Sequence, residues 1–432
     1  MRSKSDKKKP LVPRLRFPEF REAGAWEVKE LGEIASISNG LTADQSGDSN
    51  GLKVTRIETI SEGCIDISKV GYIDRIEGVE RFGLRIGDIL FSHINSQSHI
   101  GKTALVEEDF DLYHGMNLLR LQVDKTENNP RFTYYLLNTE FFRKSVQARS
   151  NQAVNQASIN QTEVGNSQIA VPSAKEQQKT AHCLSSLDEV IGLQAKKVQA
   201  LKRHKKGLMQ QLFPAEGETT TPRLRFPEFR EAGAWEKKRL GTQGGFLTPL
   251  SGKSAKDFDA GDAKFIPYMN VFSNTFTDIQ DLRSVIITDD ESQNAVAKGD
   301  VFFTVSSETP EEAGMSSVLL GDVDRCYLNS FCALFRFDDH LSPNLIFLGY
   351  LLRSRSVRCH LSRGAQGATR YNISKLVFKE LPLVFPLAKE QQKIAHCLSS
   401  LDEVIGLESH KLDTLKNLKK GLMQQLFPQE VA

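Results

Sequence analysis

Two polar segments in each half of the chain carry side chains that can read the edges of nucleic-acid bases. In the first half they are SHINSQSHIGK at 92–102 and RSNQAVNQASIN at 149–160. In the second half they are SSET at 306–309 and RGAQGATRYN at 363–372. Asn and Gln can pair with adenine, Arg and Lys with guanine, and Ser and Thr with either. These residue types indicate recognition of DNA rather than a reaction.

The candidate DNA-binding residues lie within these four segments and in the helical stretches just before the second segment of each half. In the first half they are Ser92, His93, Asn95, Gln97, His99, Lys102, Arg149, Asn151, Gln152, Asn155, Gln156, Ser158 and Asn160. In the second half they are Ser306, Ser307, Glu308, Thr309, Arg358, Arg363, Gln366, Thr369, Arg370 and Asn372. Basic residues that precede the second segments could also hold phosphates, namely Arg143, Lys144, Arg353 and Arg355. A solvated surface is the competing interpretation of any single segment, but the paired arrangement favours recognition.

Sequence motifs that would carry catalysis are absent. HIGKT at 99–103 and SGKS at 251–254 resemble the end of a P-loop, but Ser96 and Leu247 stand where its first glycine is needed. No GxGxxG, HExxH or GxSxG motif is present, and the six cysteines form no CxxC pair. We therefore expect no catalytic residue, metal or cofactor in this chain, and reduced thiols.

Composition indicates a soluble globular protein. The 432 residues are enough for about two to three domains, and 39% are hydrophobic and 25% charged. No apolar run reaches the roughly 18 residues of a membrane span, and the basic start MRSKSDKKKP has no apolar stretch behind it, so we expect a cytoplasmic protein. The net charge of +2 leaves no strongly basic footprint. DNA binding would therefore depend on local clusters or on the charge of a partner.

The polar segments belong to a unit that occurs twice. PRLRFPEFREAGAWE stands at 13–27 and again at 222–236, and AKEQQKTAHCLSSLDEVIGL at 174–193 returns at 388–407 with one change. Each unit is an arm, a variable body and a long helix. The bodies share almost no sequence but follow the same order of short β-strands, polar segments and a helix that begins near a proline, at 130–146 and 342–361. We expect two copies of one fold with different targets, and arms that are extended and end in a buried Trp26 or Trp235.

The repeated helices carry an apolar heptad seam. Its residues are Leu184, Leu187, Ile191, Val198, Leu201 and Leu208 in the first copy, and Leu398, Leu401, Ile405, Leu412, Leu415 and Leu422 in the second. The seam is interrupted by Gln194 and Lys205, and by their counterparts Glu408 and Lys419. A heptad seam predicts an intrachain coiled coil, and the alternative is two amphipathic helices, each packed on its own domain. Gly192 and Gly207 inside the helix suggest close helix approach or a bend.

The predicted fold class is α+β, with two similar mixed α/β domains separated by two long antiparallel helices in a pseudo-twofold arrangement. The predicted boundaries are a disordered basic tail at 1–12, a first recognition domain with its arm at 13–171, a central helix at 172–214, a linker at 215–221, a second recognition domain with its arm at 222–385, a C-terminal helix at 386–428 and a tail at 429–432. Pro172, Pro214, Pro386 and Pro428 mark the helix limits.

The duplicated AWExxxLG segments, Trp26 to Gly32 and Trp235 to Gly241, and the duplicated KEQQK…LD…QQLF helices resemble the specificity subunit of type I restriction–modification systems. The resemblance covers nearly the whole chain. It implies that each body reads one half of a split double-stranded DNA site, and that the helices bind two methyltransferase subunits, which restriction subunits then join. The partner subunits would use S-adenosylmethionine, ATP and Mg, whereas this chain would hold no cofactor.

The resemblance also implies a division of labour. This chain would not be an enzyme, whereas the assembled complex would be a type I site-specific deoxyribonuclease and an adenine-specific DNA methyltransferase. Because the bodies differ, the half-sites should differ, and readers on one DNA face would lie about one helical turn apart. A two-lobed, non-catalytic scaffold or adaptor is the alternative function.

Overall fold

The computed structural model describes residues 11–44, 50–97, 99–153, 156–215, 220–288, 290–338 and 343–429. The chain forms two compact units: unit 1 comprises Met1–Ala195 and His410–Ala432, and unit 2 comprises Lys196–Ser409. Each unit has its own large hydrophobic core.

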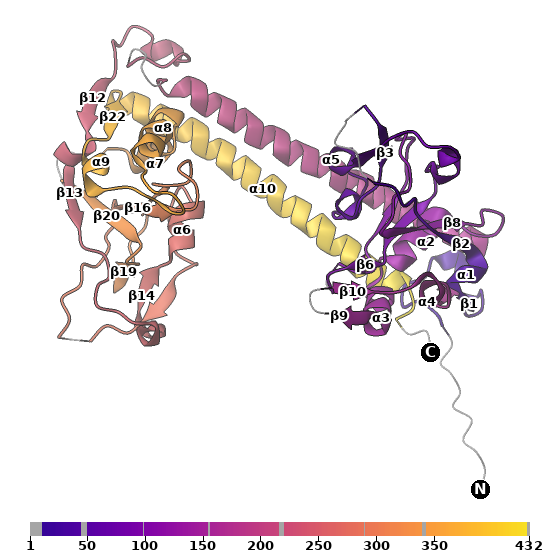
Figure 1. Cartoon of the computed structure of the whole chain (residues 1–432). Coiled ribbons are helices and arrows are strands. Elements are labelled where there is room, and N and C mark those ends of the chain that lie inside the picture. Colours follow the sequence, from indigo (N-terminus) through magenta and orange to yellow (C-terminus); the bar gives the residue numbers. More distant parts are fainter. Residues whose placement is uncertain are drawn as a thin grey trace. The chain divides into compact units, whose positions relative to one another are not determined.

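Unit 1 is built around a four-stranded antiparallel sheet of order β2-β8-β5-β7 (Figure 1). Before the long helix its elements are β1 (Glu27–Glu30), α1 (Leu31–Ile34), β2 (Ala35–Asn39), β3 (Leu52–Val54), β4 (Gly71–Ile73), β5 (Ile89–Ser92), β6 (Ile94–Asn95), β7 (Thr103–Leu105), β8 (Leu118–Val123), α2 (Pro130–Leu137), α3 (Glu140–Arg149), β9 (Asn151–Ala153), β10 (Gln156–Ser158), α4 (Gln161–Gly165) and β11 (Gln168–Val171). β1 pairs with β11, β3 with β4, and β10 lies between β6 and β9.

Unit 2 has a four-stranded antiparallel sheet of order β13-β20-β16-β18. Before the second long helix its elements are β12 (Glu236–Arg239), β13 (Gly244–Leu247), β14 (Phe258–Ile266), α6 (Tyr268–Ser273), β15 (Arg283–Val285), β16 (Val301–Thr304), β17 (Ser306–Ser307), β18 (Ser316–Val318), β19 (Cys326–Leu328), β20 (Cys332–Phe337), α7 (Leu345–Leu352), α8 (Arg355–Gly364), β21 (Tyr371–Asn372), α9 (Lys375–Lys379) and β22 (Pro382–Phe385). β12 pairs with β22, β17 with β21, and β14 lies between β15 and β19.

The two main sheets have the same topology although their sequences differ. β5 and β16 are the corresponding inner strands, and every residue of both is buried. Each follows a Gly-Asp turn in which the glycine has positive φ, +97° at Gly87 and +93° at Gly299. The carboxylates of Asp88 and Asp300 each accept a hydrogen bond from the backbone N–H three residues earlier, at 3.0 and 2.7 Å. The expectation of one fold used twice is confirmed.

The single helix predicted in each body is instead two helices. In unit 1 the break falls between α2 and α3, where the Thr139 hydroxyl accepts the N–H of Phe142 and so caps the second helix. In unit 2 the corresponding break between α7 and α8 lies at Ser354. The prediction of proline at the first helical position holds for Pro130, whereas α7 begins after an asparagine cap, Asn344, that follows Pro343.

The arms end in buried tryptophans, as predicted, and each is tied to the start of a long helix. Arg16 donates two hydrogen bonds to Glu176, at 2.8 and 2.7 Å, and the Trp26 indole N–H donates to the same carboxylate at 3.2 Å. In unit 2 Arg225 pairs with Glu390 at the same two distances.

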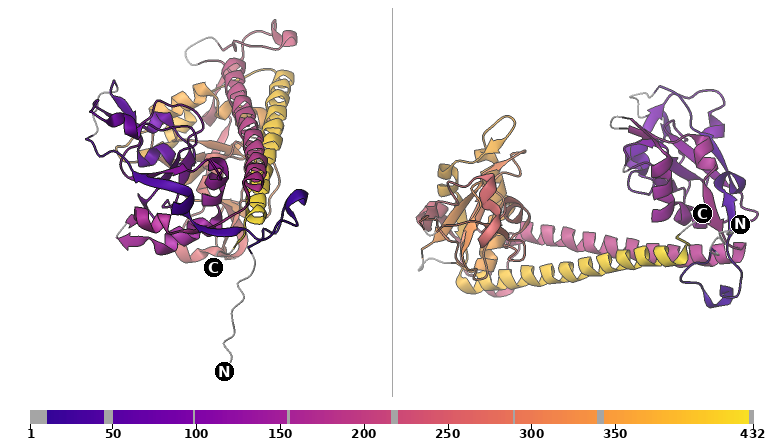
Figure 2. Two further views of the ribbon diagram at one scale, coloured as in Figure 1. Left: turned by 90° about the vertical axis from the view of Figure 1, so that its right-hand side faces the viewer. Right: turned by 90° about the horizontal axis from the view of Figure 1, so that it is seen from below.

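The long helices α5 (Ala174–Leu212) and α10 (Ala388–Leu426) begin and end two residues inside the ranges predicted for them. Within unit 2 the second half of α5 runs antiparallel to the first half of α10, because Lys205 contacts Asp402 and Lys197 contacts Glu408 (Figure 2). Within the described part of this chain no neighbour approaches Gly192 or Gly207, since a Cβ added at either would meet nothing within 4 Å.

Candidate nucleic-acid interface

In unit 1 the two polar segments, at 92–102 and 149–160, meet in one small sheet. β10 pairs with β6 on one side, with Ala157 opposite Asn95, and with β9 on the other. The Ile159 N–H also donates to the His93 carbonyl at 2.9 Å. The tertiary fold therefore combines both segments into a single surface.

Unit 2 brings its two polar segments together in the same way. β17 pairs antiparallel with β21, with Ser306 opposite Asn372 and Ser307 opposite Tyr371. Asn372 and Gln366 exchange two backbone hydrogen bonds, at 2.8 and 2.9 Å, which close the hairpin that precedes β21. The two units thus place unlike polar side chains on corresponding strands.

About half of the predicted contact residues present exposed side chains. They are Gln97, Asn151, Gln152 and Asn160 in unit 1, and Glu308, Thr309, Arg363, Gln366, Thr369, Arg370 and Asn372 in unit 2. Ser158, His99 and Ser306 are partly buried, and His99 Nδ1 lies 2.9 Å from the Ser96 hydroxyl. Asn155 lies outside the described residues, and only the backbone of Gln156, in β10, is described.

Other predicted residues of unit 1 support the loops from within. The Asn95 side chain donates to the buried Ser92 hydroxyl at 3.1 Å, and Lys102 donates to the Ser61 carbonyl at 2.7 Å. Arg149 donates to the Glu163 carbonyl and to the Ser167 hydroxyl. These groups already have partners, so they position the surface more than they present donors to a ligand.

Two further polar residues of unit 1 have roles within the domain itself. The Oδ1 of the exposed Asn160 side chain accepts the N–H of Glu163 at 2.8 Å and so caps α4. His93 is buried, and burial lowers the pKa of its imidazole to about 4. At neutral pH His93 is therefore uncharged.

In unit 2 the arginines divide into inward and outward groups. Arg358 donates to the carbonyls of Glu311, Ala313 and Gly314, and Arg353 donates to four carbonyls that include those of Val271 and Ser316. Burial lowers the pKa of both guanidinium groups to about 10. Arg370 instead points outward and has no hydrogen-bond or ion-pair partner among the described side chains.

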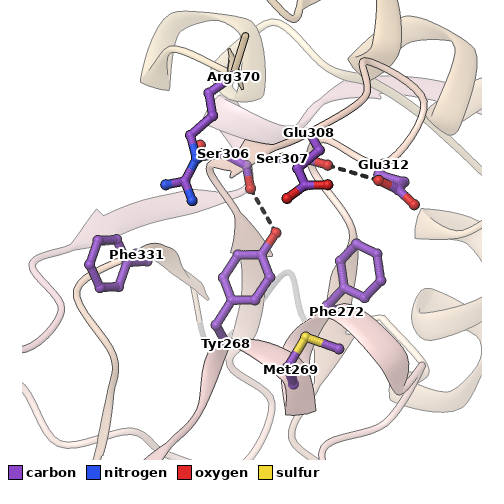
Figure 3. Close-up of a pocket in the computed structure, with 9 residues that line it drawn as sticks. All are labelled: Tyr268, Met269, Phe272, Ser306, Ser307, Glu308, Glu312, Phe331 and Arg370. Carbon is purple, nitrogen blue, oxygen red and sulfur yellow. Dashed lines mark hydrogen bonds between the residues drawn. The ribbon is translucent and has the colours of Figure 1, made fainter. Parts of the chain in front are cut away.

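A pocket of 460 Å³ lies beside the β17–β21 pair (Figure 3). Ser306, Ser307, Glu308, Glu312 and Arg370 form its polar part, and Tyr268, Met269, Phe272 and Phe331 its apolar part. The Tyr268 hydroxyl donates to the Ser306 carbonyl at 2.7 Å, and the Ser307 hydroxyl to Glu312 at 3.2 Å. Figure 3 shows the guanidinium of Arg370 directed between Phe331 and Tyr268.

Sequence reasoning missed the apolar part of this pocket. Met269 and Phe331 lie outside the predicted polar segments, and their side chains are 58% and 65% exposed. α6, which supplies three of the four apolar side chains, lies in a segment with no polar signal. Only the fold brings it next to the predicted segments.

Unit 1 has a basic groove that the sequence indicated in part. Arg143 and Lys144 on α3 line it with Lys416 and Lys420 of α10, and its volume is 550 Å³. Lys144 pairs with Glu140 at 2.6 Å, whereas Arg143 Nε is buried and has no hydrogen-bond partner within the described part of unit 1. The groove can accept the negative charge of a phosphate.

The residues of the predicted helix seam on α5 and α10 are buried to different degrees. Leu184, Val198, Leu398 and Ile405 are buried, and the other eight seam residues are partly buried. In the EVIGL segment of each helix the valine and the leucine are exposed, Val190 and Leu193 on α5 and Val404 and Leu407 on α10, whereas the isoleucine belongs to the seam. Leu193 is 67% and Leu407 73% exposed.

Across the described ranges, no cluster of three or more His, Cys, Asp or Glu residues could hold a metal ion. None of the helices described is long and apolar enough to cross a membrane.

Comparison with known proteins gives matches over both repeats. The family model of the type I restriction modification DNA specificity domain matches residues 24–203 and 235–417. A putative type I restriction enzyme MjaX specificity subunit of Methanocaldococcus jannaschii is 31% identical over 415 residues, which cover 93% of this chain and 92% of that protein. The MjaVIII specificity subunit of the same organism is 26% identical over 268 residues, 61% of each chain.

Solved structures are similar in fold. The S subunit of a type I restriction-modification system from M. genitalium has a TM-score of 0.55 at 14% identity, with 98% of this chain and all of that chain covered. A chain from a structure concerned with complex assembly and conformational transition of the type I R-M system has a TM-score of 0.57 at 18% identity, with 94% and 98% covered. At such identities the likeness concerns the fold.

Proposed function

The chain belongs to the type I restriction–modification DNA specificity family, and from this premise we propose that its two recognition domains read the two unlike halves of a bipartite double-stranded DNA site. It is a non-catalytic specificity subunit with two DNA specificity domains. In this proposal the first domain spans 13–171 and the second 222–385, and each reads one half-site.

One observation carries the proposal: the small sheets that join the two polar segments of each unit bear different exposed side chains. Asn151 and Gln152 lie in β9, which pairs with β10 in unit 1, while Arg370 precedes β21 and Asn372 lies in it, paired with β17 in unit 2. Amides favour adenine and arginine favours guanine, so the same scaffold would select different bases. An asymmetric site follows from this difference.

Phosphate contacts would come from basic residues on the surface rather than from every predicted arginine. The groove with Arg143 and Lys420 in unit 1, and the exposed Arg355 and Arg363 in unit 2, are suited to this role. Arg149 and Arg358 would act on DNA only indirectly, since their guanidinium groups hold carbonyls of their own domain.

We further propose that the helices bind two methyltransferase subunits, which restriction subunits join, and that S-adenosylmethionine, ATP and Mg serve those partners. The outward Leu193 and Leu407 support this, because each lies on a helical surface beside an exposed glycine, Gly192 or Gly406, where another helix could approach closely. DNA as target implies a cytoplasmic location.

Mapping of methylated adenines after co-expression with the cognate methyltransferase tests the DNA proposal. The expected result is one asymmetric motif in two parts with an unspecified spacer. A continuous or palindromic motif would contradict the assignment of one domain to each half-site. Absence of any motif, together with no footprint on DNA, would favour the scaffold alternative.

A binding assay tests the helical surface. Leu193→Glu and Leu407→Glu should each weaken capture of the methyltransferase, because a charge would be buried in an apolar contact. Ile279→Glu is the matched control, since Ile279 is also exposed but is not part of either long helix. Equal capture by all variants would exclude this surface.

A further inference from the structure

We propose that the pocket of unit 2 reads thymine: the side chains of Met269 and Phe331 contact the 5-methyl group of a thymine in the major groove, and Arg370 pairs with a neighbouring guanine. This inference rests on the proposed function and specifies what the second recognition domain reads. The contact through α6 and the Phe331 loop is additional to the polar segments.

The apolar wall is fixed before any ligand binds. The Phe331 N–H donates at 2.9 Å to the side chain of Asn329, which is buried and also donates to the Ile266 carbonyl at 2.9 Å. This bond holds the loop so that the Phe331 ring stays in solvent. On α6 the rings of Tyr268 and Phe272 stack with centroids 5.9 Å apart, which supports the helix that carries Met269.

Exposure of two large apolar side chains beside a polar rim indicates a partner surface with an apolar group of matching size. On the major-groove edges of the four bases, the thymine methyl is the apolar group that such a surface can contact. The same edges present the acceptors of guanine, to which arginine donates two hydrogen bonds. Met269, Phe331 and Arg370 line one pocket, so neighbouring base pairs can satisfy all three.

The charged residues of the pocket favour contact with DNA bases over contact with DNA phosphates. Glu308 and Glu312 lie in the same lining as Arg370, and a phosphate there would be repelled by both carboxylates. Within the described part of unit 2 the Glu308 carboxylate has no hydrogen-bond or ion-pair partner. A carboxylate can accept the amino group of cytosine, so Glu308 beside Arg370 suits a G·C pair next to the thymine.

Uracil substitution tests the thymine contact, because it removes the methyl group and leaves every hydrogen-bonding group in place. The assay measures binding of the complex with its methyltransferase to duplexes that carry the mapped site, with each thymine of both half-sites replaced in turn. At one position, wild-type affinity should fall about fourfold, the effect of one buried methyl group. In a Met269→Ala, Phe331→Ala double variant, thymine and uracil should bind equally at that position.

Ile279→Ala is the matched control and should keep the fourfold preference, and thermal unfolding of each variant checks that the domain is intact. Arg370→Ala should relax the choice of base at a G·C pair next to the sensitive thymine. If no thymine in either half-site shows a methyl preference that depends on Met269 and Phe331, the inference is wrong, although a mapped bipartite motif would still support the proposed function. If no motif exists, the proposed function itself fails.

Discussion

The ammonium group of Lys419 lies 2.6 Å from the carboxylate of Asp188, which also accepts the hydroxyl of Tyr135 at 2.7 Å. Unit 2 repeats this arrangement with Lys205, Asp402 and Tyr350 at the same distances. Each lysine also lies over the ring of its tyrosine. The lysines that interrupt the heptad seam thus join both long helices to a helix of the recognition domain.

Asp188→Asn should destabilise unit 1, because it removes the charge that balances Lys419 while the Tyr135 hydroxyl keeps only a weaker acceptor. The groups are partly exposed, so we expect a loss of about 1–2 kcal/mol in the free energy of unfolding. Asp413→Asn is the control, as Asp413 is exposed on α10. Denaturant unfolding measures the stability of both variants. If Asp188→Asn is as stable as Asp413→Asn, the contacts of Asp188 with Lys419 and Tyr135 contribute nothing to stability.

Glu176→Gln should lower the free energy of unfolding by more, roughly 3–5 kcal/mol, because it leaves the buried Arg16 without its charge partner. The side chains of Arg16 and Glu176 are only 7% and 2% exposed. Replacement of both Arg16 and Glu176 by methionine should recover much of the lost stability, since no buried charge then remains. A double variant no more stable than Glu176→Gln would mean that the ion pair itself is required.

Acidification should destabilise unit 1 between pH 6.5 and pH 4. Burial lowers the pKa of His93 and His114 to about 4, so the unfolded chain binds protons in this range while the folded unit does not. Stability is therefore complete above pH 6.5 and falls by up to about 3 kcal/mol per histidine on the way to pH 4. Thermal unfolding across this range should show a shallower pH dependence in His93→Asn and His114→Asn. An unchanged pH dependence would mean that these histidines do not cause the loss of stability.

Arg370→Ala and Asn372→Ala should weaken recognition of one half-site only. Loss of a good side-chain pair with a base costs about 1–3 kcal/mol of discrimination. Gln152→Ala is the counterpart in unit 1 and should affect the other half-site. Binding to duplexes mutated in one half at a time measures this separation, and equal loss at both halves would mean that these residues serve general affinity.

Insertion of four residues after Lys196, about one helical turn, should change the spacer between the half-sites and leave both half-site sequences unchanged. The site lies in the continuous helix α5, between the seam residues Ile191 and Val198. Mapping of methylated adenines reads the result. An unchanged spacer would show that the helix does not set it.

The sequence alone determined the large-scale plan of this protein. Repeats and prolines marked the two long helices to within two residues at each end, because these signals depend on neighbours in the chain. The break between α2 and α3 was not predicted, since an apolar periodicity continues across it and only the cap at Thr139 divides the helices.

The tertiary structure decided what the repeated and polar residues do. Glu176 and Gln177 stand in an obvious repeat, but only folding shows that one holds Arg16 and the other accepts the N–H of Asn129 at 2.9 Å. Arg358 and Arg370 looked alike as DNA contacts, yet the first donates to carbonyls more than forty residues away and the second stays in solvent. Whether a side chain turns inward depends on acceptors brought near by distant segments, which local sequence does not encode.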